Sequence, residues 1–276
     1  MSEPPALEDR EALRRLVAAV GSSRRIVAFT GAGISTESGI PDYRGPGGVW
    51  ESRRPPTLGD FLDNPEARLG YWARRLVEYP TLVSRQPNAG HRALVALERR
   101  GHLLGVITQN IDGLHQKAGN NPDRVVELHG TSHLIRCMSC GRTFLSLEIQ
   151  RRLDAGEEEP TCAVCGGILR SATVLFGESL PTAALETAVA LAQACDLMLV
   201  VGSSLIVNPA ARLPEIAKRR GATLAIVNRT ETPLDHLADI LVRAGAGPTL
   251  TAVVDGLDLP TESDTPGHPD DAVPSS

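Results

Sequence analysis

Aromatic residues are scarce in this sequence, and long hydrophobic runs are missing. Phe, Trp and Tyr make up 3% of the 276 residues, and the formal net charge is −5. A nucleic-acid groove needs a basic surface and rings on which bases stack, so this composition argues against nucleic acid as a partner. Because no run of about 18 apolar residues occurs, neither a membrane-spanning helix nor a membrane partner is expected.

The first ten residues also lack the pattern of a secretory signal. They include Glu3, Glu8 and Asp9 and no apolar stretch, whereas a signal peptide starts with positive charge and continues into an apolar segment. The expected location is therefore the cytoplasm. Hydrophobic residues still make up 42% of the chain, which is enough for one large domain with a smaller insert.

Four of the five cysteines form two Cys-x-x-Cys pairs, each followed by glycine. The pairs are Cys137 with Cys140 and Cys162 with Cys165, and 21 residues separate them. Disulfides are rare in a reducing cytoplasm, so clustered thiols point to metal or redox chemistry. Two such pairs can close a tetrahedral four-sulfur site around one Zn²⁺, and since no coordination position stays open, the zinc would be structural.

The distance along the chain between the two pairs is slightly longer than usual for such a zinc site. Residues 153–159, Leu-Asp-Ala-Gly-Glu-Glu-Glu, are predicted to form an exposed loop that absorbs the excess. The alternative interpretation is a pair of thioredoxin-like redox motifs. The fifth cysteine, Cys195, follows an apolar segment and is predicted to be a small core residue.

Short apolar runs alternate with amphipathic segments along most of the chain. The runs are too brief for helices and predict buried strands at residues 26–29, 103–108, 197–201, 224–227 and 240–242. Helices are predicted over residues 7–20, 88–100 and 209–220. Gly21 would end the first helix, Asn88 would cap the second, and Pro209 would lie in the first turn of the third. This alternation predicts an α/β fold, a doubly wound and mostly parallel sheet.

Two segments interrupt the alternation and are predicted to form a second, smaller domain over one edge of the sheet. Residues 46–85 would be a helical insert, and residues 131–170 carry the cysteine pairs. The sheet domain would then be discontinuous, with residues 7–45, 86–130 and 171–256. Residues 257–276, rich in Pro, Asp, Ser and Thr, are predicted to be a disordered tail.

A glycine-rich turn follows the first predicted strand, at Thr30-Gly31-Ala32-Gly33-Ile34-Ser35. Glycines let the backbone approach a pyrophosphate, and the amides of a following helix can bind it. The generic dinucleotide fingerprint needs a third small residue three positions after Gly33, where Thr36 stands, so the turn alone is equally compatible with a tight bend. Residues 37–45 continue with Gly, Pro and polar residues, which favours a loop that covers a ligand.

Six motifs in order make the sequence resemble the sirtuin family of NAD-dependent protein lysine deacylases. The first joins the glycine-rich turn to Gly39-Ile40-Pro41-Asp42-Tyr43-Arg44, and the second is Thr108-Gln109-Asn110-Ile111-Asp112-Gly113-Leu114-His115. The other four are Leu128-His129-Gly130, which precedes the cysteine pairs, Phe176-Gly177-Glu178, Gly202-Ser203-Ser204 and Val227-Asn228. The resemblance covers roughly residues 20–254.

The resemblance implies a Rossmann-like sheet domain that binds NAD as co-substrate, beside one structural zinc ion. It also implies that the acyl group of an acyl-lysine is transferred to ADP-ribose while nicotinamide is released. His129 would take a proton from a ribose hydroxyl, since a neutral imidazole is a base near physiological pH. Outside this context, a histidine at the end of the strand around residues 125–128 would more often be a hydrogen-bonded structural residue.

The remaining residues of the NAD site are likewise implied by the resemblance. Asp112 would accept from the nicotinamide amide, whereas Gln109 and the catalytic Asn110 would orient the ribose and the water. Asn110 and Asp112 could also merely cap a turn. Ser35 and Arg44 would lie at the phosphates. The other residues expected to bind NAD are Gly31, Ala32, Gly33, Thr36, Asp42, Tyr43, Ile111, Gly202, Ser203, Ser204, Asn228 and Ala246.

Peptide substrates of this family bind between the two domains as an added strand. The residues that would line this groove are Val174, Phe176 and Gly177. The sequence departs from the commonest family pattern at Ser171-Ala172, where Pro followed by an acidic residue or His is frequent, at Leu175, where an aromatic residue is frequent, and at Tyr43, where Phe is usual. These departures leave the preferred acyl group and peptide open.

Tyr71 and Arg74 resemble the Tyr-x-x-Arg motif of sirtuins that remove succinyl and malonyl groups. Three positions apart on a helix, the two residues share a face and could recognise a distal carboxylate. In the simpler interpretation, Tyr71 packs inside the helical insert and Arg74 is solvated.

Three other functions stay open at this point. Mono-ADP-ribosyl transfer would use the same NAD cleavage with a different acceptor. The incomplete glycine fingerprint disfavours a dehydrogenase, and the run from Gln109 to Asp112 together with His129 disfavours a pure zinc-ribbon binding module. The expected partners are acylated-lysine proteins, and nothing in the sequence indicates an oligomeric state.

Overall fold

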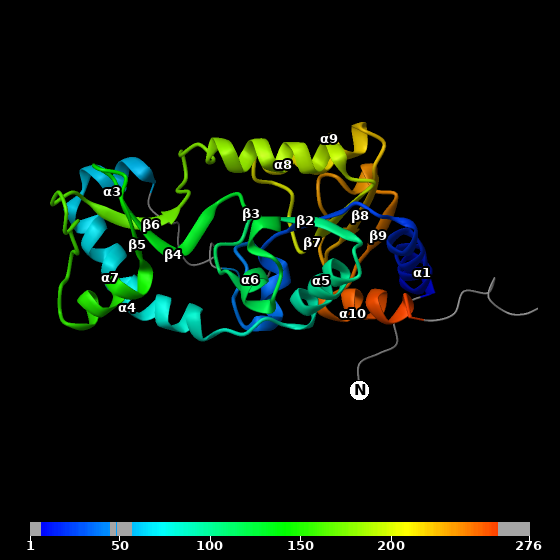
Figure 1. Ribbon diagram of the computed structural model, residues 1–276, viewed down its shortest axis with the longest axis horizontal. Coiled ribbons are helices and arrows are strands. Elements are labelled where there is room, and N and C mark those ends of the chain that lie inside the picture. Colours follow the sequence, from blue (N-terminus) through cyan, green and yellow to red (C-terminus); the bar gives the residue numbers. More distant parts are fainter. Residues whose placement is uncertain (1–6, 45–47, 49–56, 259–276) are drawn as a thin grey trace, which may run out of the picture.

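Two β-sheets of different size organise the chain in the computed structural model, which describes residues 7–44, 48 and 57–258. Six parallel strands form the large sheet in the order β3-β2-β1-β7-β8-β9, and three antiparallel strands form the small sheet in the order β5-β4-β6. The two sheets lie next to one another along the long axis of the molecule (Figure 1). The predicted doubly wound α/β fold with a smaller insert is therefore confirmed.

The strands of the large sheet coincide with the apolar runs of the sequence. They are β1 (Ile26–Thr30), β2 (Leu103–Thr108), β3 (Val125–Glu127), β7 (Leu197–Val201), β8 (Thr223–Val227) and β9 (Ile240–Val242). Every residue of β1 and β7 is buried. Full burial explains why these strands are continuously apolar rather than alternating, since helices cover both faces of a parallel sheet.

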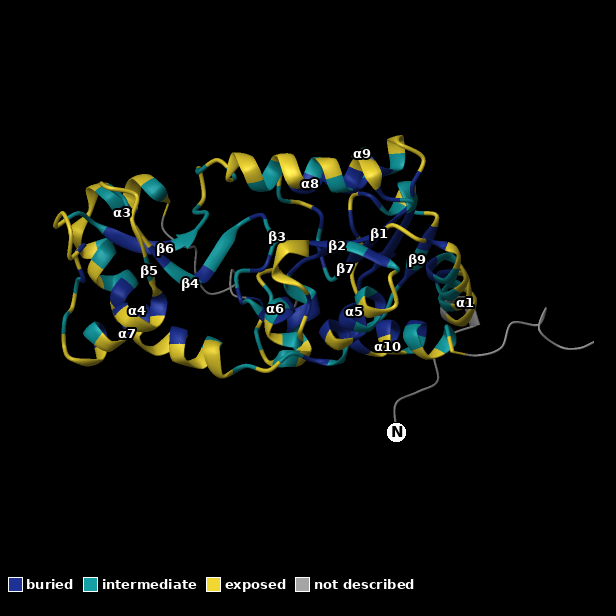
Figure 2. Cartoon of the chain, viewed as in Figure 1, coloured by how far each residue is buried: buried dark blue, intermediate teal, exposed yellow. Residues whose placement is uncertain are grey.

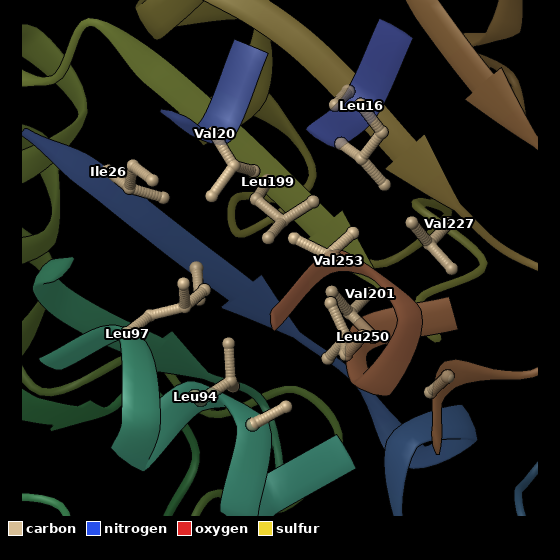
Figure 3. Close-up of a cluster of buried hydrophobic side chains, with 14 of the residues drawn as sticks. Leu16, Val20, Ile26, Leu94, Leu97, Leu199, Val201, Val227, Leu250 and Val253 are labelled. Carbon is tan, nitrogen blue, oxygen red and sulfur yellow. The ribbon is translucent and has the colours of Figure 1, made fainter. Parts of the chain in front are cut away.

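Five helices cover the two faces of the large sheet. On one face lie α1 (Leu7–Ser22), α5 (Ala89–Arg99) and α10 (Ala246–Gly256), and on the other lie α8 (Thr182–Ala194) and α9 (Arg212–Arg219). Successive strand residues point to opposite faces, so Ala28 belongs to the first core and Phe29 to the second. Figure 3 shows the first core, where Leu94 and Leu97 of α5 face the sheet together with Leu250 of α10.

Two of the predicted helix boundaries need correction. Asn88 caps α5 as expected, since its Oδ1 accepts from the amides of Gly90 and His91. The helix predicted over residues 209–220 begins only at Arg212, because the chain makes a turn at Pro209, which follows a cis peptide bond. Helix α1 does not end at Gly21 but includes it and continues to Ser22.

The small sheet has its own helices and its own core. It consists of β4 (Gly130–Cys137), β5 (Thr143–Leu145) and β6 (Leu169–Thr173), with α3 (Leu58–Asp63), α4 (Pro65–Ser84) and α7 (Ser146–Asp154) around it. Trp72, Ile135, Ile149 and Leu169 are buried in this third core. Strand β6 extends beyond the expected boundary at residue 170, because Ser171, Ala172 and Thr173 also pair with β4.

Two segments predicted to be exposed are partly packed. Leu153 was expected in a loop but is a buried residue of α7, so the loop between the cysteine pairs is shorter than predicted. At the start of the predicted tail, Leu257 packs against the first core and Asp258 pairs with Arg100 at 2.8 Å. Residues 259–276, the rest of that tail, lie outside the described residues.

Short elements complete the architecture: 3-10 helices η1 (Ala32–Ser38), η2 (Pro122–Arg124) and η3 (Asp235–Leu237), and helix α6 (Leu114–Ala118). Exposed surface is concentrated on the outer sides of the helices, whereas the strands of the large sheet are mostly buried (Figure 2). Within the described part of the chain, no helix combines the length and the apolar character that crossing a membrane requires.

Candidate active site

The carboxyl ends of the central strands face the small sheet across one cleft. A cavity of about 2220 Å³ lies there, lined by residues of both sheets and their helices. Ligands of doubly wound sheets bind at this end, where the strand order reverses, and in this chain the reversal lies between β1 and β7. All residues that the sequence assigned to NAD or to the substrate line this single cavity, including Tyr71, Arg74 and His129.

The glycine-rich turn follows β1 and packs against Gly202, which follows β7. Gly33 donates its amide hydrogen to the carbonyl of Gly202 at 2.8 Å, and a Cβ atom on Gly33 would lie 2.7 Å from the Gly202 Cα. Glycine is therefore required at this position by contact between two backbones. After the turn the chain forms η1 rather than an α-helix, so the amides that follow the strand are those of a 3-10 helix.

A buried polar network joins the glycine-rich turn to the end of β2. The Ser35 hydroxyl donates to Asp112 Oδ2 at 2.7 Å, and Asn110 Nδ2 donates to the Gly31 carbonyl and to Ser35 Oγ, both at 3.1 Å. Asp112 Oδ1 accepts from the amide of Leu114, the first residue of α6, at 2.9 Å. Ser35 lines the cavity, and its hydroxyl hydrogen is engaged by Asp112.

His129 follows β3 and is held by the residue next to Asn110. Its Nδ1 lies 2.8 Å from the Gln109 carbonyl oxygen, which can only accept, so Nδ1 carries the proton and Nε2 keeps its lone pair. Burial lowers the pKa of His129, and the hydrogen bond to Gln109 opposes this more weakly. The imidazole is therefore neutral at physiological pH and able to accept a proton.

Two buried histidines behind this network were not predicted as part of the site. His115 Nε2 lies 2.9 Å from Thr30 Oγ1, and the His91 and His115 rings are 5.0 Å apart. Burial lowers the pKa of His91 to about 4 and that of His115 to about 3. The usable signal in the sequence was a histidine three residues after the cap Asn88, a capping-box position on an otherwise apolar helix face.

The opposite wall of the cleft is the segment between β6 and α8. The Val174 amide donates to the His129 carbonyl at 2.9 Å, and the Leu58 amide donates to the Phe176 carbonyl at 3.4 Å. The Phe176 side chain is 45% exposed. This segment thus borders the cleft beside His129, where the sequence placed Val174, Phe176 and Gly177.

The four paired cysteines meet at the end of the small sheet. Their sulfur atoms all lie within 4.8 Å of one another, with Cys137 and Cys165 at 3.5 Å and Cys140 and Cys162 at 3.8 Å. A tetrahedron with Zn–S bonds of about 2.3 Å has edges of about 3.8 Å, so the sulfur positions fit a zinc ion. Gly141, at φ 72°, and Gly166, at φ 70°, make the left-handed turns after each pair. The predicted four-sulfur site is confirmed.

Comparison with known proteins agrees with this geometry. The Sir2 family model matches residues 31–209. NAD-dependent protein deacetylase 1 of Bradyrhizobium diazoefficiens is 45% identical over 241 residues, which cover 87% of this chain and 94% of that protein. NAD-dependent protein deacetylase 2 of Streptomyces coelicolor is 44% identical over 236 residues, which cover 84% of this chain and 97% of the relative.

Solved structures of Sir2 proteins share the fold of this chain. A structure from work on the mechanism and regulation of Sir2 enzymes has a TM-score of 0.81 and 39% identity, covering 90% of this chain and 98% of its own. A complex of a Sir2 protein with a p53 peptide and NAD⁺ has a TM-score of 0.79 and 36% identity, covering 88% and 97%.

Proposed function

The chain belongs to the Sir2 family, and from that premise we propose that it is an NAD-dependent protein lysine deacylase. It transfers the acyl group of an acylated lysine side chain to ADP-ribose and releases nicotinamide. The observation that carries this proposal is a single cleft in which the glycine-rich turn, the buried Asp112 and the neutral His129 lie opposite the segment of residues 174–177.

The cleft fits NAD both in size and in the groups that line it. Small-molecule sites usually occupy about 300–1,000 Å³, so the cavity of about 2220 Å³ has room for a dinucleotide and a peptide side chain. The glycine-rich turn, Asn228 at the end of β8 and Ala246 at the start of α10 line one end, and Asp112 lines the other. When bound, NAD supplies the ribose carbon that receives the acyl group.

The residues of the chain then bind, orient and move a proton. His129 accepts a proton at Nε2, because its Nδ1 hydrogen is engaged by Gln109. Asn110 uses both Nδ2 hydrogens inside the protein, which leaves Oδ1 to orient a ribose hydroxyl or a water molecule. The small sheet and the segment of residues 174–177 position the acyl-lysine, and such positioning lowers the barrier of a bimolecular reaction.

Incubation of acyl-lysine peptides with NAD and analysis of the products by mass spectrometry tests this function. We expect acyl-ADP-ribose and free lysine peptide from the wild type, and about a 10²–10⁴-fold slower reaction from His129→Ala, the usual contribution of a general base. NAD-dependent deacylation retained in His129→Ala would remove His129 from its role. Absence of acyl-ADP-ribose with every peptide, or ADP-ribose attached to protein instead, would favour mono-ADP-ribosyl transfer.

A second candidate, activity on succinyl or malonyl lysine, rests on how Tyr71 and Arg74 line the cleft. Two hydrogen bonds to Ser171 hold the Tyr71 hydroxyl. The hydroxyl oxygen lies 2.6 Å from Ser171 Oγ and accepts from the Ser171 amide at 3.0 Å. Arg74 lines the same cavity and forms no ion pair with another described residue. The pair can therefore bind a carboxylate at the far end of an acyl chain.

Two variants distinguish this candidate from plain deacetylation. Arg74→Met should lower kcat/KM for a succinyl-lysine peptide about tenfold or more, the usual effect of losing a charge-assisted hydrogen bond, and should leave the acetyl peptide unaffected. Tyr71→Phe tests the hydroxyl in the same assay. If the wild type turns over the succinyl peptide no faster than background, acidic-acyl activity is ruled out.

We place the protein in the cytoplasm, where the thiols of its four-cysteine site stay reduced.

A further inference from the structure

Lysine is almost absent from this chain. Of the 28 basic residues only Lys117 and Lys218 are lysines, and the structure engages both amines. Lys218 Nζ pairs with the carboxylate of Asp239 at 2.5 Å. Lys117 instead donates to two backbone carbonyls, those of Val83 at 2.9 Å and Arg85 at 2.6 Å. A protein that acts on acylated lysines therefore exposes one amine whose partners among the described residues are main-chain oxygens.

The Lys117 amine connects α6 to the end of α4. Asp112 accepts from the amide of Leu114, the first residue of helix α6, and Lys117 lies one turn further along that helix. Helix α4 ends at Ser84, and the carbonyls of its last turn have no intrahelical donor. The Lys117 ammonium satisfies one of them, the Val83 carbonyl, together with the carbonyl of the following C-cap residue Arg85, and it interacts favourably with the negative end of the helix. The contact thus joins the main helix of the small-sheet region to the polar network of the candidate active site.

The segment that follows this contact supports the NAD side of the cleft. A Cβ atom on Gly39 would lie 2.7 Å from Nη1 of Arg85, so the Arg85 side chain rests against the Gly39 turn. Three residues on, Asn88 Nδ2 donates to the Ile34 carbonyl at 2.7 Å and to Ser38 Oγ at 3.0 Å. Holding the end of α4 in place therefore also holds η1, whose residues line the cavity.

Next to the amine lies a small cavity that reaches Asp112. Its volume is about 150 Å³, and it is lined by Leu82, Val83, Arg85, Asp112, Gly113, Leu114, Lys117 and His133. An acyl group on Lys117 could enter this space. An acylated amine keeps one hydrogen and no charge, so it cannot donate to both carbonyls as the ammonium does.

We propose that Lys117 is a regulatory acylation site, and that its acylation releases the end of α4 and weakens NAD binding. The deprotonated amine attacks the carbonyl carbon of an acyl thioester or acyl phosphate, and the C–N amide bond forms as the C–S or C–O bond to the carrier breaks. The thiolate or phosphate leaves with the bonding electron pair, and the proton lost by the nitrogen passes to it or to water. The hydrogen bonds from Lys117 to the Val83 and Arg85 carbonyls thus act as a latch that holds the end of α4. Reversal of the acylation rests on the proposed function: a second copy of the chain removes the acyl group with NAD, and the latch forms again.

The two lysines provide a matched pair for the test. Nε-acetyllysine is introduced at position 117 or, as control, at position 218, and NAD binding is measured by calorimetry alongside the KM for NAD with an acetyl peptide. We expect acetylation at 117 to weaken NAD binding and raise that KM about tenfold, the usual effect of a lost charge-assisted hydrogen bond, and acetylation at 218 to change both less than twofold. Equal effects at both positions, or none at 117, would overturn the proposal.

Two further measurements separate a latch from general instability. Hydrogen exchange should accelerate in residues 80–88 and 113–118 of the 117-acetylated chain only, and Lys117→Gln should reproduce the change in NAD binding while Lys117→Arg should not. Unchanged exchange in these segments would count against the latch.

To test reversal, His129→Ala protein acetylated at Lys117 is incubated as substrate with the wild-type enzyme and NAD. Peptide mapping then shows whether the acetyl group on Lys117 has been removed. Loss of the acetyl group is expected. If acetyl peptides are hydrolysed but the Lys117 acetyl group persists, reversal fails while the proposed function stands. If acetyl peptides are also inert, the proposed function fails, and the calorimetry still decides whether Lys117 acts as a latch.

Discussion

At the scale of single residues, the chemistry depends on side chains that burial keeps neutral. His129, His91 and His115 all have their pKa lowered mainly by burial. Burial disfavours the imidazolium because the protein interior solvates charge poorly. For His129 this leaves a base ready to accept a proton, and for the other two it leaves neutral supports beneath Thr30 and Asp112. The same physical cause therefore supports the catalytic role proposed for His129 and keeps His91 and His115 neutral inside the fold.

The pH dependence of the reaction follows from His129. Protonation of Nε2 removes the base, so kcat/KM should fall as the pH drops through the pKa of His129. Since burial places this pKa below the ordinary 6.5, the acid limb of kcat/KM for an acetyl peptide should have its midpoint below pH 6.5. Circular dichroism at each pH controls for unfolding. A midpoint at or above 6.5 with the fold intact would contradict the assignment.

The stability of the protein should also decrease in acid because of the buried histidine pair. The unfolded chain binds protons near pH 6.5, whereas folded His91 and His115 bind them only near pH 4 and 3. Between these limits the unfolded state carries more protons, so the free energy of unfolding falls as the pH drops, by roughly 1.4 kcal/mol per pH unit for each histidine. Urea unfolding at pH 7 and pH 5 measures this loss.

Histidine-selective ¹⁵N spectra provide the direct check on that pair. Both imidazoles should remain neutral at pH 5 in the folded protein, while zinc retention is monitored so that metal loss is not mistaken for histidine protonation. Charged His91 or His115 signals at pH 5.5 in the folded state would show that the pair does not account for acid sensitivity.

At the scale of elements, β6 connects the zinc region to the substrate side of the cleft through one arginine. The buried Arg170 donates to Glu178 Oε1 and to the Thr173 carbonyl, both at 2.5 Å, and its Nε lies 3.0 Å from Met138 Sδ. Glu178 in turn accepts from the Leu175 amide at 3.1 Å. Met138 lies between Cys137 and Cys140. The Arg170 side chain therefore connects the first cysteine pair to the segment of residues 174–177 at the cleft.

Loss of this bridge should affect the peptide more than NAD. Arg170→Met leaves Glu178 without its partner and frees residues 174–177, so the KM for an acetyl peptide should rise about tenfold, while the KM for NAD stays within twofold. Arg170→Lys, which keeps the charge, should recover part of the loss. A parallel rise of both KM values would mean that Arg170 acts only through general stability.

The elements themselves were largely predictable, whereas the contacts between them were not. Strands such as residues 197–201 are continuously apolar because helices cover both faces of the sheet. Asn88 indicates the start of α5 because asparagine is a favoured N-cap residue. The motifs also drew attention to Gln109, Asp112 and His129, which line one cleft in the structure. In contrast, Pro209 was assigned to a helix because proline is common in the first turn of helices. In the structure, residues 208–211 form a turn and the helix begins at Arg212.

Long-range hydrogen bonds explain most of what sequence reasoning missed in the site. The hydrogen bond from the Ser35 hydroxyl to Asp112, which is 77 positions away in the sequence, was not among the predictions. Arg170 and Lys117 gave no local signal because their partners are carbonyls or residues brought close only by folding. The pairing of His91 with His115 is likewise made only by folding. Periodicity and capping report on neighbours along the chain, so such pairings lie beyond them.

At the scale of the whole molecule, two separately packed regions border one cleft. The large sheet has hydrophobic cores on both of its faces, and the small sheet has a third core that includes Cys137 and Cys162 beside Trp72. The third core, to which two of the four sulfur ligands belong, contains no residue of the large sheet. Zinc therefore contributes to one region directly and to the cleft only through it.

Removal of zinc should unfold the small sheet and spare the large one. Cys162→Ala, or prolonged chelation of the wild type, takes away a ligand or the ion from a site whose binding energy is also folding energy. We expect less than one bound zinc per chain by elemental analysis, a red shift of the Trp72 fluorescence, loss of deacylation, and retained protection from hydrogen exchange in β1 and β7. Cys195→Ala is the matched control, because Cys195 is buried in the second core and away from the sulfur site. A Cys162→Ala protein that stays active after chelation would show that the ion is dispensable, and exchange protection lost throughout the large sheet would show that the two regions unfold as one unit.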